Sequence, residues 1–334
     1  MSTARASLAI AEALIPGSST LRAADEVTVR RAEEIMGSLH PALLPVWRAA
    51  QRTLDAAAYG RRGQPFQALG AREQDDLLRR WERDPVLGRP LAIVSFVYKL
   101  VHFDEPPRKG LPLADALERP RWLQQVVRGD DWEGGDVECD AVIVGSGAGG
   151  GVVGRELAAR GHAVVFVEEG QLHRRDAFDG SAVRAHQRFY RPAFSVGNVL
   201  MPIFVGRMVG GSTAINGGTC IRTPDSVLTR WCEDFKSDAF SAEAMAPLFE
   251  RVETVLEVAP ARREIIGPIG DVMARGCDAL GWNHFPLSRN APDCDGSGFC
   301  DFGCATGARR SVEIAYLPPA LQGGAQLFTG TKVE

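Results

Sequence analysis

A glycine-rich turn between an apolar run and a helical segment constrains the fold of this chain more than any other feature. Residues 139–144 are apolar and β-branched, which predicts a buried parallel strand, and residues 149–160 follow a helical pattern. A second apolar run occupies residues 163–167. Strand, helix and strand within about 30 residues make a βαβ unit. The sequence therefore predicts an α/β, Rossmann-like domain.

The turn itself reads GSGAGG and satisfies the pattern GxGxxG. In this pattern the first glycine permits the tight turn, the second lets backbone N–H groups approach a pyrophosphate, and the third lets helix and strand pack closely. The N-terminus of the following helix attracts the same anion. The turn predicts a dinucleotide site with the candidate residues Gly145, Ser146, Gly147, Ala148, Gly149 and Gly150.

An acidic residue ends the second strand, as a dinucleotide site requires. Glu168 lies 23 residues after Gly145, where its carboxylate can accept hydrogen bonds from both hydroxyls of an adenosine ribose. The same charge repels a 2′-phosphate, which disfavours NADP. Glu169 is the adjacent alternative, but neighbouring side chains in a strand point to opposite faces. We therefore expect Glu168 to contact the ribose. These residues alone suit NAD and FAD equally.

A second glycine block distinguishes between NAD and FAD as the predicted cofactor. Residues 206–222 read GRMVGGSTAINGGTCIR, and two glycine pairs allow this backbone to lie flat against a planar ligand. The block resembles the flavin-facing signature of the glucose-methanol-choline (GMC) oxidoreductases, and Glu168–Gly170 resembles the end of that family's second strand. The resemblance covers residues 139–334 and implies a GMC-type FAD-binding domain.

By position, the resemblance implies which residues hold FAD. The first turn holds the pyrophosphate, Glu168 the ribose, and Asn216 with its neighbours the isoalloxazine ring near N5, while Val333 offers backbone groups to adenine. Cys220 and Thr223 depart from the general family pattern, which leaves the subfamily open. The candidates in the second block are Gly206, Gly210, Gly211, Ser212, Asn216, Gly217, Gly218 and Thr219.

The resemblance also implies the reaction. GMC enzymes oxidise an alcohol CH–OH group: a histidine base takes the hydroxyl proton and the carbinol hydrogen passes as hydride to flavin N5. That histidine comes late in the family sequence, and none of the six histidines here matches it. The catalytic residue is therefore unknown, although His284 beside Trp282 merits a test. We expect a truncated chain, the cofactor-binding half of the enzyme, with a possible companion chain supplying the C-terminal part.

The cysteines argue against a disulfide scaffold, because they are seven and none precedes Cys139. Cys294, Cys300 and Cys304 are separated by five and three residues, without the paired spacing or fourth ligand of a structural zinc site, so we expect no metal. This loop resembles one in long-chain alcohol oxidase-like and cholesterol oxidase-like GMC proteins, which implies an apolar long-chain or sterol-like alcohol. Arg309, Arg310 and Ser311 either hold this loop against the cofactor or include a solvated basic pair, and we expect the solvated pair.

Residues 1–130 are predicted to form a small helical domain. Apolar residues recur at helical spacing, as at Trp47 and Leu54, and breaks are expected at Pro41 and residues 60–65, 84–90 and 105–110. The stretch at 8–103 also resembles the small helical subunit of gluconate dehydrogenase-type complexes. A polar, glycine-rich segment at 129–136 marks the predicted boundary, and the FAD-binding domain is placed at 137–334.

Charge and hydropathy narrow the possible partners. There are 38 Lys and Arg against 42 Asp and Glu, a net charge of −4, which gives no polycationic surface for nucleic acid. The longest apolar stretch, residues 91–103, is too short and too polar to span roughly 30 Å of hydrocarbon. No signal peptide precedes it, so the expected location is cytoplasmic, with peripheral membrane contact still compatible.

Two other functions stay open at this point. An NAD-dependent dehydrogenase predicts a regular βαβαβ continuation after Glu168, but residues 171–205 have little helical periodicity. A non-catalytic module, such as a truncated paralogue or one half of a split complex, is the second alternative. Either would differ from an alcohol-oxidising flavoprotein in its visible absorption.

Overall fold

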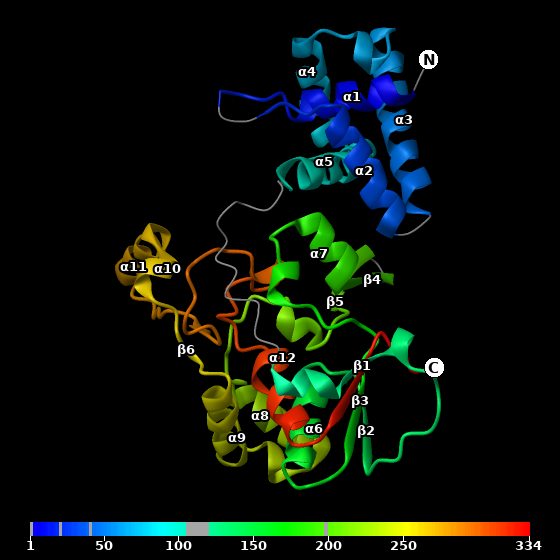
Figure 1. Cartoon of the computed structure of the whole chain (residues 1–334). Coiled ribbons are helices and arrows are strands. Elements are labelled where there is room, and N and C mark those ends of the chain that lie inside the picture. The colour runs from blue at the N-terminus through cyan, green and yellow to red at the C-terminus, as the bar shows by residue number, and fades with distance from the viewer. Residues whose placement is uncertain (1–2, 20–21, 40–41, 105–119, 197–199) are drawn as a thin grey trace. The chain divides into compact units, whose positions relative to one another are not determined.

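The computed structural model describes residues 3–19, 22–39, 42–104, 120–196 and 200–334 (Figure 1). Two compact units divide the chain: Met1–Pro107 with Ser181–Gln187, and Arg108–Gly180 with Arg188–Glu334. The division falls after Pro107 and not at the predicted boundary, residues 129–136. The helical pattern was expected to continue to Arg128, but Val126–Arg128 forms strand β1 in the sheet of the second unit.

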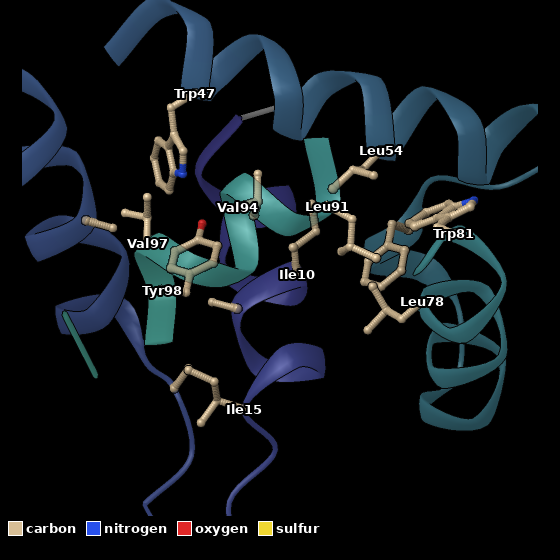
Figure 2. Packing of buried hydrophobic residues seen from close by; sticks show 14 of the residues in the cluster. Ile10, Ile15, Trp47, Leu54, Leu78, Trp81, Leu91, Val94, Val97 and Tyr98 are labelled. Carbon is tan, nitrogen blue, oxygen red and sulfur yellow. The ribbon is translucent and has the colours of Figure 1, made fainter. Parts of the chain in front are cut away.

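The described residues of the first unit up to Asp104 form five α-helices. Apolar side chains at helical spacing face a common core, and Figure 2 shows Trp47, Leu54, Trp81 and Tyr98 meeting there. The predicted helical period is confirmed, while the predicted breaks at Pro41 and 105–110 lie outside the described residues. The helices are α1 (Thr3–Leu14), α2 (Glu26–Leu39), α3 (Leu43–Arg62), α4 (Ala71–Glu82) and α5 (Gly88–Phe103), with a 3₁₀ turn at Phe66–Ala68.

Two of the predicted breaks show why these helices begin and end where they do. Helix α3 ends at Arg62 because Gly63 takes a left-handed conformation, with φ 69°, and donates its N–H to the carbonyl of Tyr59. Pro90 does not interrupt α5, because it lies in the first turn, where a helix needs no backbone donor.

A buried carboxylate explains why residues 181–187 belong to the helical unit. Asp104, just after α5, accepts hydrogen bonds from Arg31 at 2.5 Å, from Ser181 Oγ at 2.9 Å and from the Val183 N–H at 3.2 Å. The last two donors lie at the start of helix α7 (Ala182–Phe189). A carboxylate at a helix N-terminus is favoured by the helix dipole, so this contact stabilises α7.

The second unit is built on a parallel sheet with the order β1-β8-β3-β2 (Figure 1). Its strands are β1 (Val126–Arg128), β2 (Ala141–Val144), β3 (Val164–Val167) and β8 (Gln326–Thr329), and α6 (Ala148–Ala158) connects β2 to β3. The predicted βαβ unit and the α/β fold class are confirmed.

Strand β2 differs from the sequence expectation in its burial. It was predicted to be buried, but in the described part of the chain it lies at one end of the sheet. Val142 and Val144 are accordingly 57% and 66% exposed. Helix α6 covers the sheet closely because its glycines leave room for the side chains beneath it. A Cβ on Gly154, for example, would overlap the ring of Phe166.

The chain between β3 and β8 does not continue as regular βα repeats. It forms α7 and an antiparallel hairpin, β4 (Tyr190–Val196) with β5 (Leu200–Gly206), and it returns to the sheet only at β8. The continuation that an NAD-dependent dehydrogenase predicts is therefore not observed. The remaining elements are α8 (Asp225–Phe235), α9 (Ala242–Val255), β6 (Ala259–Pro260), α10 (Arg263–Ile266), α11 (Pro268–Leu280), β7 (Ser288–Arg289), α12 (Val312–Ala315) and α13 (Leu317–Gln322), with short 3₁₀ turns between them.

None of the helices in the described residues is both long and apolar enough to cross a membrane.

Candidate functional site

A cleft of about 590 Å³ opens at the carboxyl ends of β2 and β3, where doubly wound sheets bind their ligands. Both glycine motifs contribute to its wall. The predicted residues that line it are Gly145, Gly147, Ala148, Glu168, Gly206, Gly211, Ser212 and Val333. Glu169, which the sequence analysis weighed as the alternative to Glu168, also lines the cleft, and sequence reasoning missed the other lining residues, which are Val144, Val167, Arg191, Val205, Thr213, Thr331 and Lys332.

One buried serine joins the two motifs. Ser146 is 0% exposed, and its N–H and Oγ donate to Glu168 Oε2 at 2.9 and 2.7 Å. The same Oγ accepts the N–H of Gly210 at 3.0 Å. The first turn, the strand-end acid and the second block are thus held by a single hydroxyl. Ser146 was predicted as a residue of the dinucleotide turn, and its side chain points into this network.

The strand-end acids are both at the cleft, in different environments. Glu168 is 6% exposed, and its Oε1 accepts the N–H of Gly170 at 2.8 Å. Glu169 is half-buried and lies 3.3 Å from Arg191 through either oxygen. Both acids line the cleft, because β3 ends at Val167 and strict alternation ends with it; that only one of them reaches the ribose stays a prediction.

The glycines divide into those that pack and those that border open space. A Cβ on Gly150 would overlap the carbonyl oxygen of Gly145, and one on Gly211 would lie 3.1 Å from the Cα of Gly147. A Cβ on Gly145, Gly149 or Gly217 would meet nothing within 4 Å. One side of the first turn is therefore backbone without side chains that borders open space. The other side, at Gly150, packs closely against Gly145. This geometry fits a pyrophosphate at the start of α6.

The far end of the second block does not line the cleft. Asn216 turns its Oδ1 back to the N–H of Gly218, at 2.9 Å, and Thr219 pairs with Arg289 in an isolated bridge. Gly218 is left-handed, with φ 69°, and borders Asn290. The structure thus brings Gly145, Glu168 and Gly211 to one cleft, but Asn216, Gly217, Gly218 and Thr219 lie beyond it.

Val333 does line the cleft, although not from within a strand. Strand β8 ends at Thr329, and the following residues run beside the acid: the Gly330 N–H donates to the Gly170 carbonyl and the Thr331 N–H to the Glu168 carbonyl, both at 2.9 Å. Val333 follows as an exposed side chain at the cleft.

Comparison with known proteins places this cleft in a family. A family model described as GMC oxidoreductase matches residues 139–334. The chain belongs to the GMC oxidoreductase family. The family predicted from the glycine motifs is thereby confirmed.

Several GMC relatives match the same part of the chain. An uncharacterized GMC-type oxidoreductase of Mycobacterium tuberculosis is 36% identical over 199 residues, which are 58% of this chain and 32% of that protein. The long-chain-alcohol oxidase FAO4B of Arabidopsis thaliana is 32% identical over 201 residues, 59% of this chain and 27% of the oxidase. The chain spans about a third of the length of the curated relatives it matches.

Two further similarities are more distant. A cholesterol oxidase of Acinetobacter baumannii is 24% identical over 229 residues, which cover 58% of this chain and 40% of that enzyme. Among solved structures, pyridoxine 4-oxidase from Mesorbium loti has a TM-score of 0.45 at 16% identity, covering 58% of this chain and 42% of the oxidase.

The three clustered cysteines of this GMC chain line a small cavity of about 20 Å³. Arg289 donates to Cys300 Sγ at 3.1 Å and to the Gly217 carbonyl at 2.8 Å, so the cysteine loop touches the second block. Among the described residues, no group of three or more His, Cys, Asp or Glu side chains is placed to hold a metal ion. His284 pairs with Asp278 at 3.0 Å and does not line the cleft.

A second cavity, of about 350 Å³, lies behind the second block. Its polar wall includes His173, Arg309 and Glu313. Burial, together with nearby Arg188, lowers the pKa of His173. Arg309 is 2% exposed, so the expectation of a solvated pair was wrong for this residue, whereas half-buried Arg310 pairs with Glu257 at 2.8 Å.

The carboxyl group of Glu313 makes a pH prediction possible. Burial raises its pKa above the ordinary 4.5, while a hydrogen bond from Ser311 Oγ, 2.5 Å from Oε1, opposes the shift. A raised folded-state pKa favours the folded protein below the unfolded pKa, and this contribution is lost as the pH rises through the folded pKa. We expect Glu313→Gln to raise the free energy of unfolding at pH 7 by about 1 kcal/mol and to flatten its decline with pH.

The measurement is urea unfolding between pH 4 and pH 8. Glu257→Gln, at the exposed pair with Arg310, is the matched control and should follow the wild type across this range. A steeper decline in Glu313→Gln than in the wild type would contradict the assignment of Glu313 as the titrating group.

Proposed function

We propose that this chain binds FAD in the cleft and forms the cofactor-binding part of an enzyme that oxidises alcohols. The observation that carries the proposal is the Ser146 junction, which holds the first turn, Glu168 and the second block around one cleft. A long dinucleotide needs such a site, because its phosphates and its redox ring must be held at once.

Each part of the cleft suits one part of FAD. The bare backbone at Gly145 and Gly147 would hold the pyrophosphate, with the N-terminus of α6 toward its charge. Glu168 would accept hydrogen bonds from the ribose, and the backbone near Val333 would lie beside adenine. The start of the second block, at Gly206, Gly211 and Ser212, would then face the isoalloxazine ring, the part that accepts electrons when FAD is bound.

The proposed substrate is a primary or secondary alcohol, and we favour an apolar, long-chain or sterol-like one. The similarity to long-chain-alcohol oxidases and to a cholesterol oxidase supports this class. We assign no catalytic base in this chain, and propose that a companion polypeptide or a further segment supplies it. The role of this chain is to bind and orient the cofactor and to keep its phosphates fixed.

The experiment is a visible absorption spectrum of the purified chain, recorded before and after denaturation, followed by titration with FAD and, separately, NAD. We expect flavin bands that denaturation converts to those of free FAD, or saturable binding of added FAD. A folded sample, judged by circular dichroism, that binds NAD but not FAD would overturn the proposal. A folded sample that binds neither would support a non-catalytic module instead.

A further inference from the structure

A buried arginine supports the second glycine block from behind. Arg309 lies 93 and 95 residues after the two groups that it contacts: one guanidinium nitrogen donates to the carbonyl of Asn216 and another to that of Ala214. Buried charge is costly unless it is hydrogen-bonded, and a hydrogen bond from a charged donor contributes about 1.5–3 kcal/mol. The guanidinium fork thus fixes two carbonyls that lie two residues apart.

The residues after Arg309 extend this support to the start of the block. The N–H of Val312 donates to Thr213 Oγ1 at 3.1 Å, and that hydroxyl donates to the Gly210 carbonyl at 2.6 Å. The Glu313 carboxyl group lies directly against Gly210, where a Cβ would overlap it. The segment 309–313 therefore contacts the block from Gly210 to Asn216.

The block needs such support because it has few side chains of its own to hold it. Gly210 and Gly211 both have positive φ, 87° and 56°, and its regular structure is one 3₁₀ turn, Gly211–Ala214. Glycine backbone has more conformations to lose on ordering than any other residue. Contacts from outside the block must therefore select the conformation that the ligand requires.

The charge of Arg309 has a second consequence. Its Nε and Glu313 Oε2 are both buried without hydrogen-bond partners among the described residues, and the two groups interact through their charges without a direct bond. Burial raises the pKa of the Glu313 carboxyl group, and the nearby charge of Arg309 opposes that shift. Among the described residues, the Arg309 guanidinium donates to backbone carbonyls and forms no ion pair with a carboxylate.

We propose that Arg309 is a positioning residue, which fixes the second block for the flavin ring and places a buried positive charge behind it. This inference rests on the proposed binding of FAD. A fixed positive charge near a redox ring favours added negative charge on that ring, so it raises the midpoint potential. The two hydrogen bonds of the guanidinium determine the affinity for FAD, and its charge determines the midpoint potential of bound FAD. The two effects can therefore be measured separately.

The test uses three variants of the full chain: Arg309→Met, Arg309→Lys and, as a matched control, Arg310→Met. The readouts are the FAD dissociation constant from fluorescence titration and the midpoint potential of bound FAD. Arg309→Met should weaken FAD binding about 100-fold, since it removes two charge-assisted hydrogen bonds, and should lower the potential. Arg309→Lys should weaken binding about tenfold and retain a potential near that of the wild type. Arg310→Met should match the wild type in both.

The outcomes separate this inference from the proposed function. A wild-type chain that folds and binds no FAD refutes the proposed function and this inference with it. If the wild-type chain binds FAD and Arg309→Lys binds it with the same affinity, this inference alone is refuted. The Arg309→Lys comparison also decides the matter if circular dichroism shows that Arg309→Met does not fold. Equal loss in Arg310→Met and Arg309→Met also refutes it, because the effect would then not depend on the buried fork.

Discussion

Replacing Gly150 with alanine should destabilise the second unit by about 3 kcal/mol. The new Cβ would overlap the carbonyl oxygen of Gly145 and approach Ile143 Cγ2 to 2.9 Å. The turn cannot withdraw easily, because the N–H of Gly145 is bonded to the Val167 carbonyl at 2.8 Å. Relief would break the end of the β2–β3 pair. The measurement is urea unfolding of the full chain, followed by far-ultraviolet circular dichroism.

Gly149→Ala is the matched control, one residue earlier in the same helix. Its Cβ would meet no atom within 4 Å, and alanine is about 1 kcal/mol better than glycine in a helix interior. This variant should be as stable as the wild type or more so. If the two alanine variants unfold at the same urea concentration, the close packing of the turn described here is wrong.

The features that the sequence revealed are those with a local cause. A β-branched run, a glycine turn and a helical period occupy consecutive residues, so the β2–α6–β3 unit could be predicted from residues 139–167 alone. The same holds for the helices of the first unit, whose apolar residues recur every three to four positions. Local pattern also singled out Glu168, and the family resemblance singled out Gly211; both line the same cleft.

The features that the sequence did not reveal depend on distant partners. Strand β1 has three residues, and its partner β8 lies about 200 residues later, with Val126 beside Leu327. A strand this short has no alternation to detect, and strand propensity is decided by neighbours. Arg309 is similar: a double arginine is typical of a solvated surface, and only carbonyls far earlier in the chain make burial of one of them favourable.

The part of Ser146 in the site was also hidden, for a related reason. In the motif it occupies an unspecified position between two glycines, so the pattern predicts nothing about its side chain. Its contacts with Glu168 and Gly210 arise only when the two motifs fold against each other. The cleft therefore depends on a polar network that neither motif contains by itself, and its central acid is the residue to remove.

Glu168→Gln should cost about 3 kcal/mol of folding free energy and weaken FAD binding more than any other single change at the cleft. Both carboxylate oxygens of Glu168 accept hydrogen bonds, Oε1 from Gly170 and Oε2 from the N–H and hydroxyl of Ser146. An amide has one acceptor oxygen, so its NH₂ group would face a backbone donor at one end or the other. A buried donor left without an acceptor destabilises the folded state by the full free energy of its desolvation.

Glu169→Gln separates this effect from a general loss of acidity at the cleft. Its carboxylate pairs with Arg191 at 3.3 Å, in a partly exposed pair, so the change should alter the unfolding free energy by about 0.5 kcal/mol or less. FAD titration then assigns the ribose contact, measured for both variants under conditions where each is folded. Loss of affinity confined to Glu168→Gln supports the acid that the strand-end motif indicates. Loss confined to Glu169→Gln would instead mean that the more accessible carboxylate holds the ribose, and that Glu168 acts only to join the two glycine motifs.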